Sequence, residues 1–334
     1  MRQDTPNNLS NERPTLAAPA AILIVNGGVD PPGGSWIELC LSQLTRTTPK
    51  GSYQVYVWNN NLGERGFYKS IQTHVSDAIL FEPRKGEALR HFHAVPLQRM
   101  YEVARPRGHH WIVTLDSDAH PVKPGWLELL IESTTGDCVL SGVWRDELSD
   151  GIPPYVHASG LCVQRAFIER FDLRFDRVAD PPIGKKMDTL SDFTEVAIAN
   201  GLQVLPWRRS NKAQFHRLIG GIYNDFIYHH GAGSRRNTLF WGEMDTTFRR
   251  KLNTVIASET ASLVFSRYDS YMHFLRSGLD NGAAGRQRLL QWLARGSETA
   301  ARRSIVALLF SHIALRDRLR ASYGRKLEAL AGSQ

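Results

Sequence analysis

The first 120 residues alternate short apolar runs with longer amphipathic segments. A run that is apolar throughout and ends in polar residues or glycine predicts a buried strand, whereas apolar residues spaced three or four apart predict a helix. The pattern therefore predicts strands and helices in turn. The expected strands are Ala21–Val25, Ser52–Asn61, Asp77–Phe81 and His109–Asp118, and the expected helices are Trp36–Thr47 and a segment from about Glu87 to Val103.

The second half of the chain has a more mixed pattern. Strand-like runs and helical runs occur there without strict alternation, and a helical pattern rich in arginine covers about residues 286–330. The expected strands are Cys138–Asp146, Tyr155–Val163 and Leu202–Trp207, the expected helices are Val163–Phe171 and Asp188–Gly201, and Asn224–Arg236 starts like a strand and ends rich in glycine.

This order of elements predicts an α/β protein with a mainly parallel sheet flanked by helices on both faces. In such sheets ligands bind beyond the carboxyl ends of the strands. The polar groups expected to gather there are Asn26 to Gly28, Asn59 to Asn61, Arg84 with Lys85, and Asp116 with Asp118.

The net charge of +8 and the pI near 9.5 suggest a nucleic-acid partner, but the excess is confined to one end of the chain. Residues 281–334 hold ten Lys or Arg and three Asp or Glu, so they carry seven of the eight net charges. Residues 1–280 are nearly neutral, which disfavours a nucleic-acid-binding groove in that part of the chain.

The cysteines predict a protein of a reducing compartment, and the apolar runs are compared with targeting and membrane segments. The three cysteines lack CxxC spacing, which predicts reduced thiols in a cytoplasmic protein. Residues 1–19 are polar, which predicts a disordered tail and suits neither a secretory signal nor a transit peptide. The apolar run Leu16–Val25 is interrupted by Pro19 and is about half the length of a membrane span.

Asp116 and Asp118 are a pair of like charges at the end of an apolar strand. Two close carboxylates repel each other unless a cation lies between them. Hard oxygen ligands favour Mg²⁺ or Mn²⁺, which complete their shells with phosphates and water. The alternative is that both are turn or N-cap residues ahead of Pro121; the buried strand and the pairing favour the metal.

The segment "LDSDAHPVKPGWLELL" resembles the DxD segment of family 2 glycosyltransferases with the GT-A (Rossmann-like) fold. Other pieces follow in the family's order: "ILIVNGG" and "VYVWNNN" before the DxD, then "ASGLCVQRAFIERFDLRFD" and "MDTLSDFTEVAIANGLQVLPW" after it. The resemblance runs from about residue 20 to 236. It implies a catalytic domain at 20–245, with a nucleotide-sugar half at 20–120 and an acceptor half at 121–245, followed by a basic helical region at 246–334.

The resemblance implies a nucleotide-diphosphate sugar as donor and Mn²⁺ or Mg²⁺ as cofactor. Asp118 is expected to bind the metal, and Asp116 to lie near the ribose or the metal's water shell. The donor-binding candidates are Asn26, Gly27, Asn59, Asn60, Arg84, Lys85, Asp116, Ser234 and Arg235. Arg84 and Lys85 are alternatively solvated surface charges, and the asparagines alternatively form a tight turn.

The family also implies a histidine ligand from a late segment, for which "YHHGAGSR" is suitably placed. His230 is the first candidate because it directly precedes Gly231, and His229 is the second. A neutral imidazole ligates well. The alternative is a structural histidine pair in a turn.

Inverting transfer needs a base for the acceptor hydroxyl, and the resemblance places it at the start of the acidic helix. Asp188 is the first candidate and Asp192 the second; Asp188 is equally explained as an N-cap. The family's usual Glu-Asp pair is missing here, because Lys185, Lys186 and Met187 precede Asp188.

Trp144, Tyr155 and His157 lie where the resemblance places the acceptor or sugar, although half-buried aromatic residues more often belong to a core. The acceptor stays open among a glycan, a lipid-linked molecule, a small molecule and a nucleobase. The C-terminal helices either pack on the domain or a second subunit, forming a homodimer, or lie at the inner membrane face; packing is favoured.

Two other classes of protein remain as alternatives. A phosphohydrolase with an Asp nucleophile also ends a strand in DxD, but its motif normally continues to Thr or Val, where this chain has Ala119 and His120. The high pI keeps a nucleotide-binding or nucleic-acid-modifying protein as the other alternative.

Overall fold

The computed structural model describes residues 20–27, 30, 34–60, 66–83, 93–146, 152–179, 187–212, 219–231, 258 and 260–277. The chain divides into two compact units, Met1–Arg276 and Ser277–Gln334. Several predictions fall outside the described residues and stay predictions: the tail at 1–19, Arg84 with Lys85, Ser234 with Arg235, the boundary at 245/246, and the helices at 286–330.

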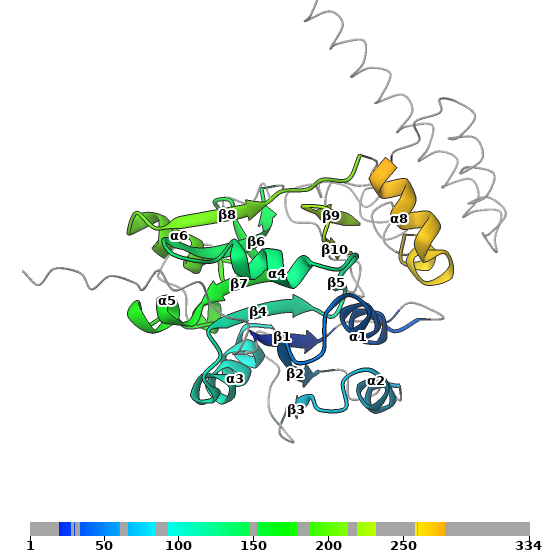
Figure 1. The fold of residues 1–334 in the computed structure, drawn as a ribbon, viewed down its shortest axis with the longest axis horizontal. Coiled ribbons are helices and arrows are strands. Elements are labelled where there is room, and N and C mark those ends of the chain that lie inside the picture. The colour runs from blue at the N-terminus through cyan, green and yellow to red at the C-terminus, as the bar shows by residue number, and fades with distance from the viewer. Residues whose placement is uncertain are drawn as a thin grey trace, which may run out of the picture. The chain divides into compact units, whose positions relative to one another are not determined.

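A seven-stranded sheet in the order β3-β2-β1-β4-β7-β6-β8 forms the centre of the first unit (Figure 1). Strands β3, β2, β1 and β4 run parallel to one another, as do β6 and β8, whereas β7 is antiparallel to both of its neighbours. The prediction of a mainly parallel sheet is confirmed. The strands are β1 Ala20–Asn26, β2 Tyr53–Asn59, β3 Ile79–Phe81, β4 Trp111–Asp116, β6 Cys138–Arg145, β7 Tyr155–Gln164 and β8 Gln203–Trp207.

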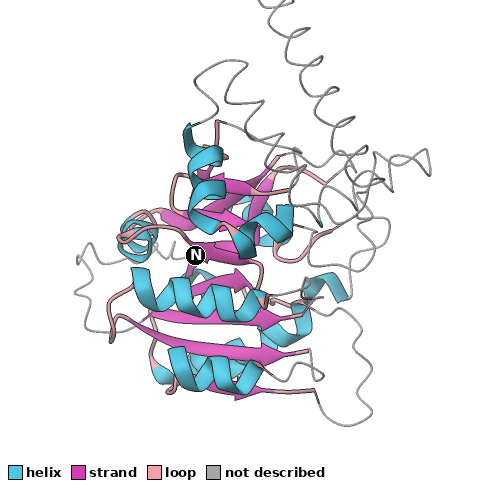
Figure 2. Cartoon of the chain, turned by 90° about the vertical axis from the view of Figure 1, so that its right-hand side faces the viewer, coloured by secondary structure: helices cyan, strands magenta, loops and turns pink. Residues whose placement is uncertain are grey.

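Both faces of this sheet are covered, which explains why its strands are apolar throughout. Successive side chains of a strand point to opposite faces. Ile22 and Ile24 of β1 belong to one core cluster, and Leu23 and Val25 to the other. The first cluster includes side chains of α1 Trp36–Thr47, α2 Phe67–His74 and α4 Trp126–Glu132, and the second those of α3 Ala94–Ala104, α5 Arg165–Arg170 and α6 Ser191–Ala199. Figure 2 shows helices lying along the strands.

The pattern of α1 shows why this segment is helical. The Ser35 hydroxyl caps the helix by accepting a hydrogen bond from the Glu38 N–H at 3.4 Å. The apolar residues Ile37, Leu41 and Leu44 share one buried face, as their spacing predicts. The helix spans the residues predicted from the sequence.

The starts of two helices bear on the predictions. Helix α3 is described from Ala94, with His93 at its N-cap, and the predicted start near Glu87 lies outside the described residues. Pro96 lacks an N–H and fits only the first turn of a helix, which is where α3 places it. Helix α6 begins at Ser191, with Leu190 at the N-cap, so Asp188 is not the N-cap residue that the alternative interpretation proposed.

A second, three-stranded sheet in the order β5-β10-β9 was not predicted as a unit. Its strands are β5 Ala119–Pro121, β9 Gly221–Tyr223 and β10 Ile227–His229, each too short for a period to be recognised. Strand β10 pairs antiparallel with β5, and His229 lies opposite Ala119. This pairing brings Tyr228 and His229, at the start of the "YHHGAGSR" segment, to the strand that directly follows Asp118.

Two 3-10 turns, η1 Arg105–Arg107 and η2 Arg177–Ala179, and helix α8 Tyr268–Ser277 are the other described elements. Helix α8 is tied to the small sheet through the Tyr268 hydroxyl, which lies 2.9 Å from His120 Nε2. None of the described helices combines the length and apolar character that crossing a membrane requires. Cys40, Cys138 and Cys162 are free thiols in the structure.

Gly142→Ala is expected to lower the free energy of unfolding by about 2–4 kcal/mol. Gly142 has φ +139°, and an added Cβ would lie 1.9 Å from the carbonyl oxygen of Gly160 on β7. Chemical denaturation measures the loss. Gly136→Ala is the control: it also has positive φ, but its Cβ would meet nothing within 4 Å. We expect it to cost only about 1 kcal/mol. Equal losses in the two variants would contradict the backbone clash.

Candidate metal and catalytic site

The two aspartates flank the turn between β4 and β5. Asp116 is the last residue of β4, and Asp118 directly precedes β5. Val25 of β1 is the register partner of Asp116, so the pair lies at the carboxyl edge of the parallel strands, as predicted. Asp118 is buried, and the Asp116 side chain is 17% exposed. Both are held in a region of low solvent access, where like charges repel strongly.

His229 is the histidine that faces this pair. Its Nε2 lies 3.6 Å from Asp116 Oδ2 and 3.7 Å from Asp118 Oδ1. His230 points elsewhere: its Nδ1 lies 2.8 Å from the Tyr228 hydroxyl, and its ring centroid lies 4.5 Å from that of Trp36. Alternation along an extended chain puts neighbouring residues on opposite sides. The geometry therefore favours His229, the second candidate from the sequence, over His230.

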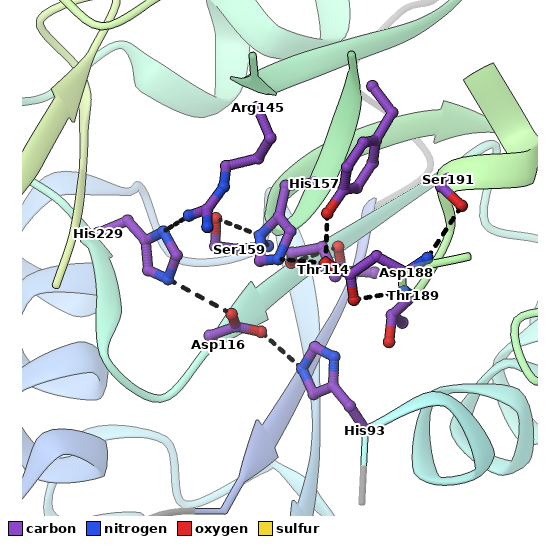
Figure 3. A network of polar contacts seen from close by, with 12 residues as sticks. His93, Thr114, Asp116, Arg145, His157, Ser159, Asp188, Thr189, Ser191 and His229 are labelled. Atoms are coloured by element: carbon purple, nitrogen blue, oxygen red, sulfur yellow. Dashed lines mark hydrogen bonds and ion pairs between the residues drawn. The ribbon is translucent and has the colours of Figure 1, made fainter. Parts of the chain in front are cut away.

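His93, which the sequence did not single out, contacts the first aspartate. Its Nε2 lies 2.6 Å from Asp116 Oδ1 (Figure 3). Burial by itself raises the pKa of Asp116, but His93, His157 and His229 outweigh it, and the pKa lies well below its usual range. Asp116 is therefore a stable anion that is already surrounded by imidazoles.

Asp188 lies on the other side of His157, just before α6. The Tyr155 hydroxyl donates a hydrogen bond to Asp188 Oδ2. The Thr189 N–H donates to Asp188 Oδ1 at 2.8 Å (Figure 3). Burial raises the pKa of Asp188, but His157, Tyr155 and the Thr189 N–H together lower it below the ordinary value. This carboxylate is ionised and oriented by two donors, as a general base has to be.

Asp192, the second candidate for the base, has different surroundings. It lies in the first turn of α6, where its charged neighbours are Arg177 and Glu195 rather than the site histidines. Burial is the main cause that raises its pKa to about 6. The geometry therefore favours Asp188 as the base.

Asp192→Asn is expected to raise the free energy of unfolding at pH 7.5 by about 1–2 kcal/mol. The folded pKa of about 6 exceeds the ordinary value of 3.8, so folding becomes less favourable as pH rises between these values. The extra free energy of unfolding of Asp192→Asn over wild type should therefore disappear as pH falls from 6 to 4. Thermal unfolding of both proteins across this range measures it, and a gain that persists at pH 4 would show another cause.

Asp116, His157 and His229 are the described group best placed to hold a cation. One ligand atom from each lies within 4.8 Å of those of the others. Burial, followed by the Arg145 guanidinium, lowers the pKa of His157 to about 4 and that of His229 well below its ordinary value. Both imidazoles are therefore neutral at pH 7, which is the form that ligates metals.

The asparagines expected to bind the donor are joined to one another at the ends of β1 and β2. Asn26 Nδ2 donates to Asn59 Oδ1 at 3.0 Å, and the Asn60 N–H donates to the Asn26 carbonyl at 2.8 Å. Trp58 Nε1 donates to Asn60 Oδ1 at 2.7 Å, and Gly27 lies against Asn60. These hydrogen bonds hold the ends of β1 and β2 together. Contact of the asparagines with a nucleotide sugar stays a prediction.

The three aromatic residues expected near an acceptor differ in surroundings. Tyr155 is buried and holds Asp188, and His157 lies within the site. Trp144 is half-buried, with the Arg208 guanidinium 6.0 Å from its ring centroid. Trp144 therefore keeps the partial exposure that stacking on a sugar requires, whereas Tyr155 does not.

No protein-family model and no curated protein matches this sequence. Solved structures do match it. A mannosyltransferase from Pyrobaculum calidifontis in complex with GDP-Man and Mn²⁺ shares 14% identity over 89% of this chain and 80% of that chain, with a TM-score of 0.41. S. aureus TarS 1–349 shares 12% identity over 83% and 79%, with a TM-score of 0.40.

A third solved structure belongs to another class of enzyme. It is a 4-diphosphocytidyl-2C-methyl-D-erythritol synthase from Anaerococcus prevotii, with 10% identity over 57% of this chain and 87% of that chain and a TM-score of 0.40. The solved structures thus include a mannosyltransferase and a synthase, at low identity. The chemistry of this chain has to be argued from its own residues.

Proposed function

We propose that this chain is a metal-dependent glycosyltransferase that moves a sugar from a nucleotide-diphosphate sugar to an acceptor hydroxyl. The observation that carries the proposal is the meeting of two segments more than a hundred residues apart. His229 lies within 3.7 Å of both Asp116 and Asp118, at the sheet edge where ligands of α/β proteins bind. Asp188 lies on the far side of His157, where the Tyr155 hydroxyl and the Thr189 N–H orient its carboxylate.

The residues fit a divalent cation such as Mn²⁺ or Mg²⁺. Asp118 and Asp116 offer hard oxygen atoms, and His229 offers a neutral imidazole. In the present arrangement Arg145 Nη1 lies 3.4 Å from His229 Nδ1, and a guanidinium can only donate. Ligation through Nε2 moves the imidazole proton to Nδ1, so Arg145 has to turn away. A contact of 3.4 Å between side chains is weak and opposes this change little.

When bound, the cation neutralises charge that develops on the leaving diphosphate. The acceptor oxygen bonds to the anomeric carbon of the sugar as the bond from that carbon to the phosphate oxygen breaks. The hydroxyl proton passes to Asp188, and the nucleoside diphosphate leaves with the bonding electrons. Attack from the side opposite the leaving group inverts the anomeric centre.

The residues around the cation site are proposed to bind the two substrates. Asn26, Asn59 and Asn60 are proposed to shape the nucleotide pocket, and Arg84, Lys85, Ser234 and Arg235 to contact the diphosphate. Trp144 is proposed to contact the sugar or the acceptor. A cytoplasmic location, and packing of the C-terminal helices on the domain or a second copy, belong to the same proposal.

Thermal-shift screening of nucleotide sugars with Mn²⁺ is the first test, because a ligand that binds only the folded state raises its stability. Hydrolysis of the best donor should need Mn²⁺ and be restored by Mn²⁺ after chelation. Asp118→Ala should abolish it, because the variant removes a buried carboxylate from the cation site. Phosphate release from simple monoesters, without binding of any nucleotide sugar, would instead support a phosphohydrolase and contradict the proposal.

A further inference from the structure

His157 occupies the centre of the site, between the aspartate pair and Asp188. It extends from β7, and its side chain is 13% exposed. Its ring centroid lies 5.4 Å from that of His229, with 26° between the ring planes (Figure 3). By proximity it qualifies as a third metal ligand together with Asp116 and His229. The hydrogen bonds of its ring nitrogens indicate a different role.

The backbone determines which nitrogen of His157 carries the proton. The Ser159 N–H donates a hydrogen bond to His157 Nδ1 at 3.1 Å, and the Ser159 hydroxyl lies 2.9 Å from the same atom. A backbone N–H can only donate, so Nδ1 is the acceptor. In a neutral imidazole the other nitrogen then carries the proton. His157 therefore presents an Nε2–H to the site.

This tautomer is incompatible with ligation through Nε2, which needs a free lone pair there. If the proton moved to Nδ1, two donors would face each other, because the Ser159 N–H also points at this atom. The Ser159 N–H is fixed by the same strand and cannot move away. His229 differs, because the donor on its Nδ1 is the side chain of Arg145, which can turn away. The two histidines have similar positions, but only His229 can readily change its tautomer.

Asp116 and the proposed base, Asp188, are the two carboxylates beside His157, and Asp188 is the one on the acceptor side. Nε2 lies 4.0 Å from Asp188 Oδ2, which is too long for a direct hydrogen bond. A single oxygen atom at about 2.8 Å from each would bridge this distance. The pair therefore suits one hydroxyl that accepts from Nε2–H and donates to the carboxylate.

We propose that His157 is not a metal ligand but the hydrogen-bond donor that positions the acceptor hydroxyl against Asp188. This inference rests on the proposed function and extends it to the acceptor side of the site. The proton balance is simple. The hydroxyl proton passes to Asp188 as the new bond to the sugar forms, and His157 keeps its own proton throughout.

The tautomer can be measured on the wild-type chain. Long-range ¹H–¹⁵N spectra of the protein labelled at histidine, without added metal, should show His157 with a protonated Nε2 and a bare Nδ1. The signal is assigned by its loss in His157→Gln. A proton on Nδ1 would overturn the inference, and this readout is independent of any transferase activity.

Calorimetric titration with Mn²⁺ separates the roles of the two histidines. His157→Gln and His157→Asn should leave Mn²⁺ affinity within about twofold of wild type, whereas His229→Asn should lower it by about tenfold or more. Losses in the His157 variants equal to that in His229→Asn would overturn the inference. A wild-type chain that binds no Mn²⁺ would instead contradict the proposed function, with the tautomer still readable.

Hydrolysis of the nucleotide sugar found by thermal shift, with water as acceptor, gives the third readout. The Gln side chain places an N–H near the former Nε2, whereas Asn does not reach it. We expect kcat to fall about tenfold further in His157→Asn than in His157→Gln, with KM for the donor little changed. Equal kcat losses in two folded variants would show a merely structural role and overturn the inference.

Discussion

Asp188→Asn is expected to lower the turnover of the nucleotide sugar by about 10²- to 10⁴-fold, the range that general bases contribute. An amide keeps the size of the side chain but cannot take the hydroxyl proton. The Tyr155 hydroxyl and the Thr189 N–H hold this carboxylate, and Asp188 is not among the proposed metal ligands. Binding of Mn²⁺ and of the donor should therefore change little.

Asp192→Asn is the matched control, because it makes the same chemical change four residues away on α6. It should keep turnover within about threefold of wild type, since its neighbours Arg177 and Glu195 are not site residues. Initial rates at saturating donor measure both variants. A large loss in Asp192→Asn, with Asp188→Asn unaffected, would assign the base to Asp192.

The pH dependence of turnover follows from the Asp188 carboxylate. Because the pKa of Asp188 is lowered below its ordinary value of 3.8, the carboxylate remains ionised down to that pH. Protonation of Asp188 should therefore not limit the rate between pH 5 and 8.

His229→Asn is expected to lower the affinity for Mn²⁺ by about 10- to 100-fold. The variant removes an imidazole nitrogen that lies within 3.7 Å of both aspartates. Asn lacks the reach and the basicity to replace it. Calorimetric titration with Mn²⁺ gives the affinity directly, and hydrolysis of the donor should need a correspondingly higher Mn²⁺ concentration.

His230→Asn is the control for His229→Asn, since the two residues are neighbours and the sequence alone ranked His230 first. Its ring is buried against Trp36 and bonds the Tyr228 hydroxyl. We expect this variant to lose about 1–3 kcal/mol of folding free energy while the folded protein keeps its Mn²⁺ affinity. The reverse result, with Mn²⁺ affinity lost only in His230→Asn, would assign the ligand to His230.

Much of the main sheet could be predicted from the pattern of apolar residues. Strand β1 and helix α1 agree with their predicted ranges to within a residue, because burial on two faces makes a strand continuously apolar and burial on one face gives a helix its period. The small sheet could not be predicted in this way. Its three-residue strands carry no period, and their pairing joins segments far apart in the chain.

The same limit applies to the site. Asp116, Asp118 and Asp188 could be selected because each follows a recognisable element or belongs to a recognisable motif. His93 and Arg145 carried no such signal: one precedes a helix in the short segment "HFH", and the other ends a strand. Only contact with Asp116 and His229 distinguishes them from other polar residues.

The sequence by itself determined the class of the fold, the edge of the sheet where polar groups gather, and the kinds of side chain available there. Those properties depend on local periodicity and residue chemistry. The tertiary structure alone decided that His229 and not His230 faces Asp116 and Asp118, because the pairing of β10 with β5 sets which side of the strand meets the site. It also decided the hydrogen bonds that hold His157 and Asp188, which depend on atoms brought together only by folding.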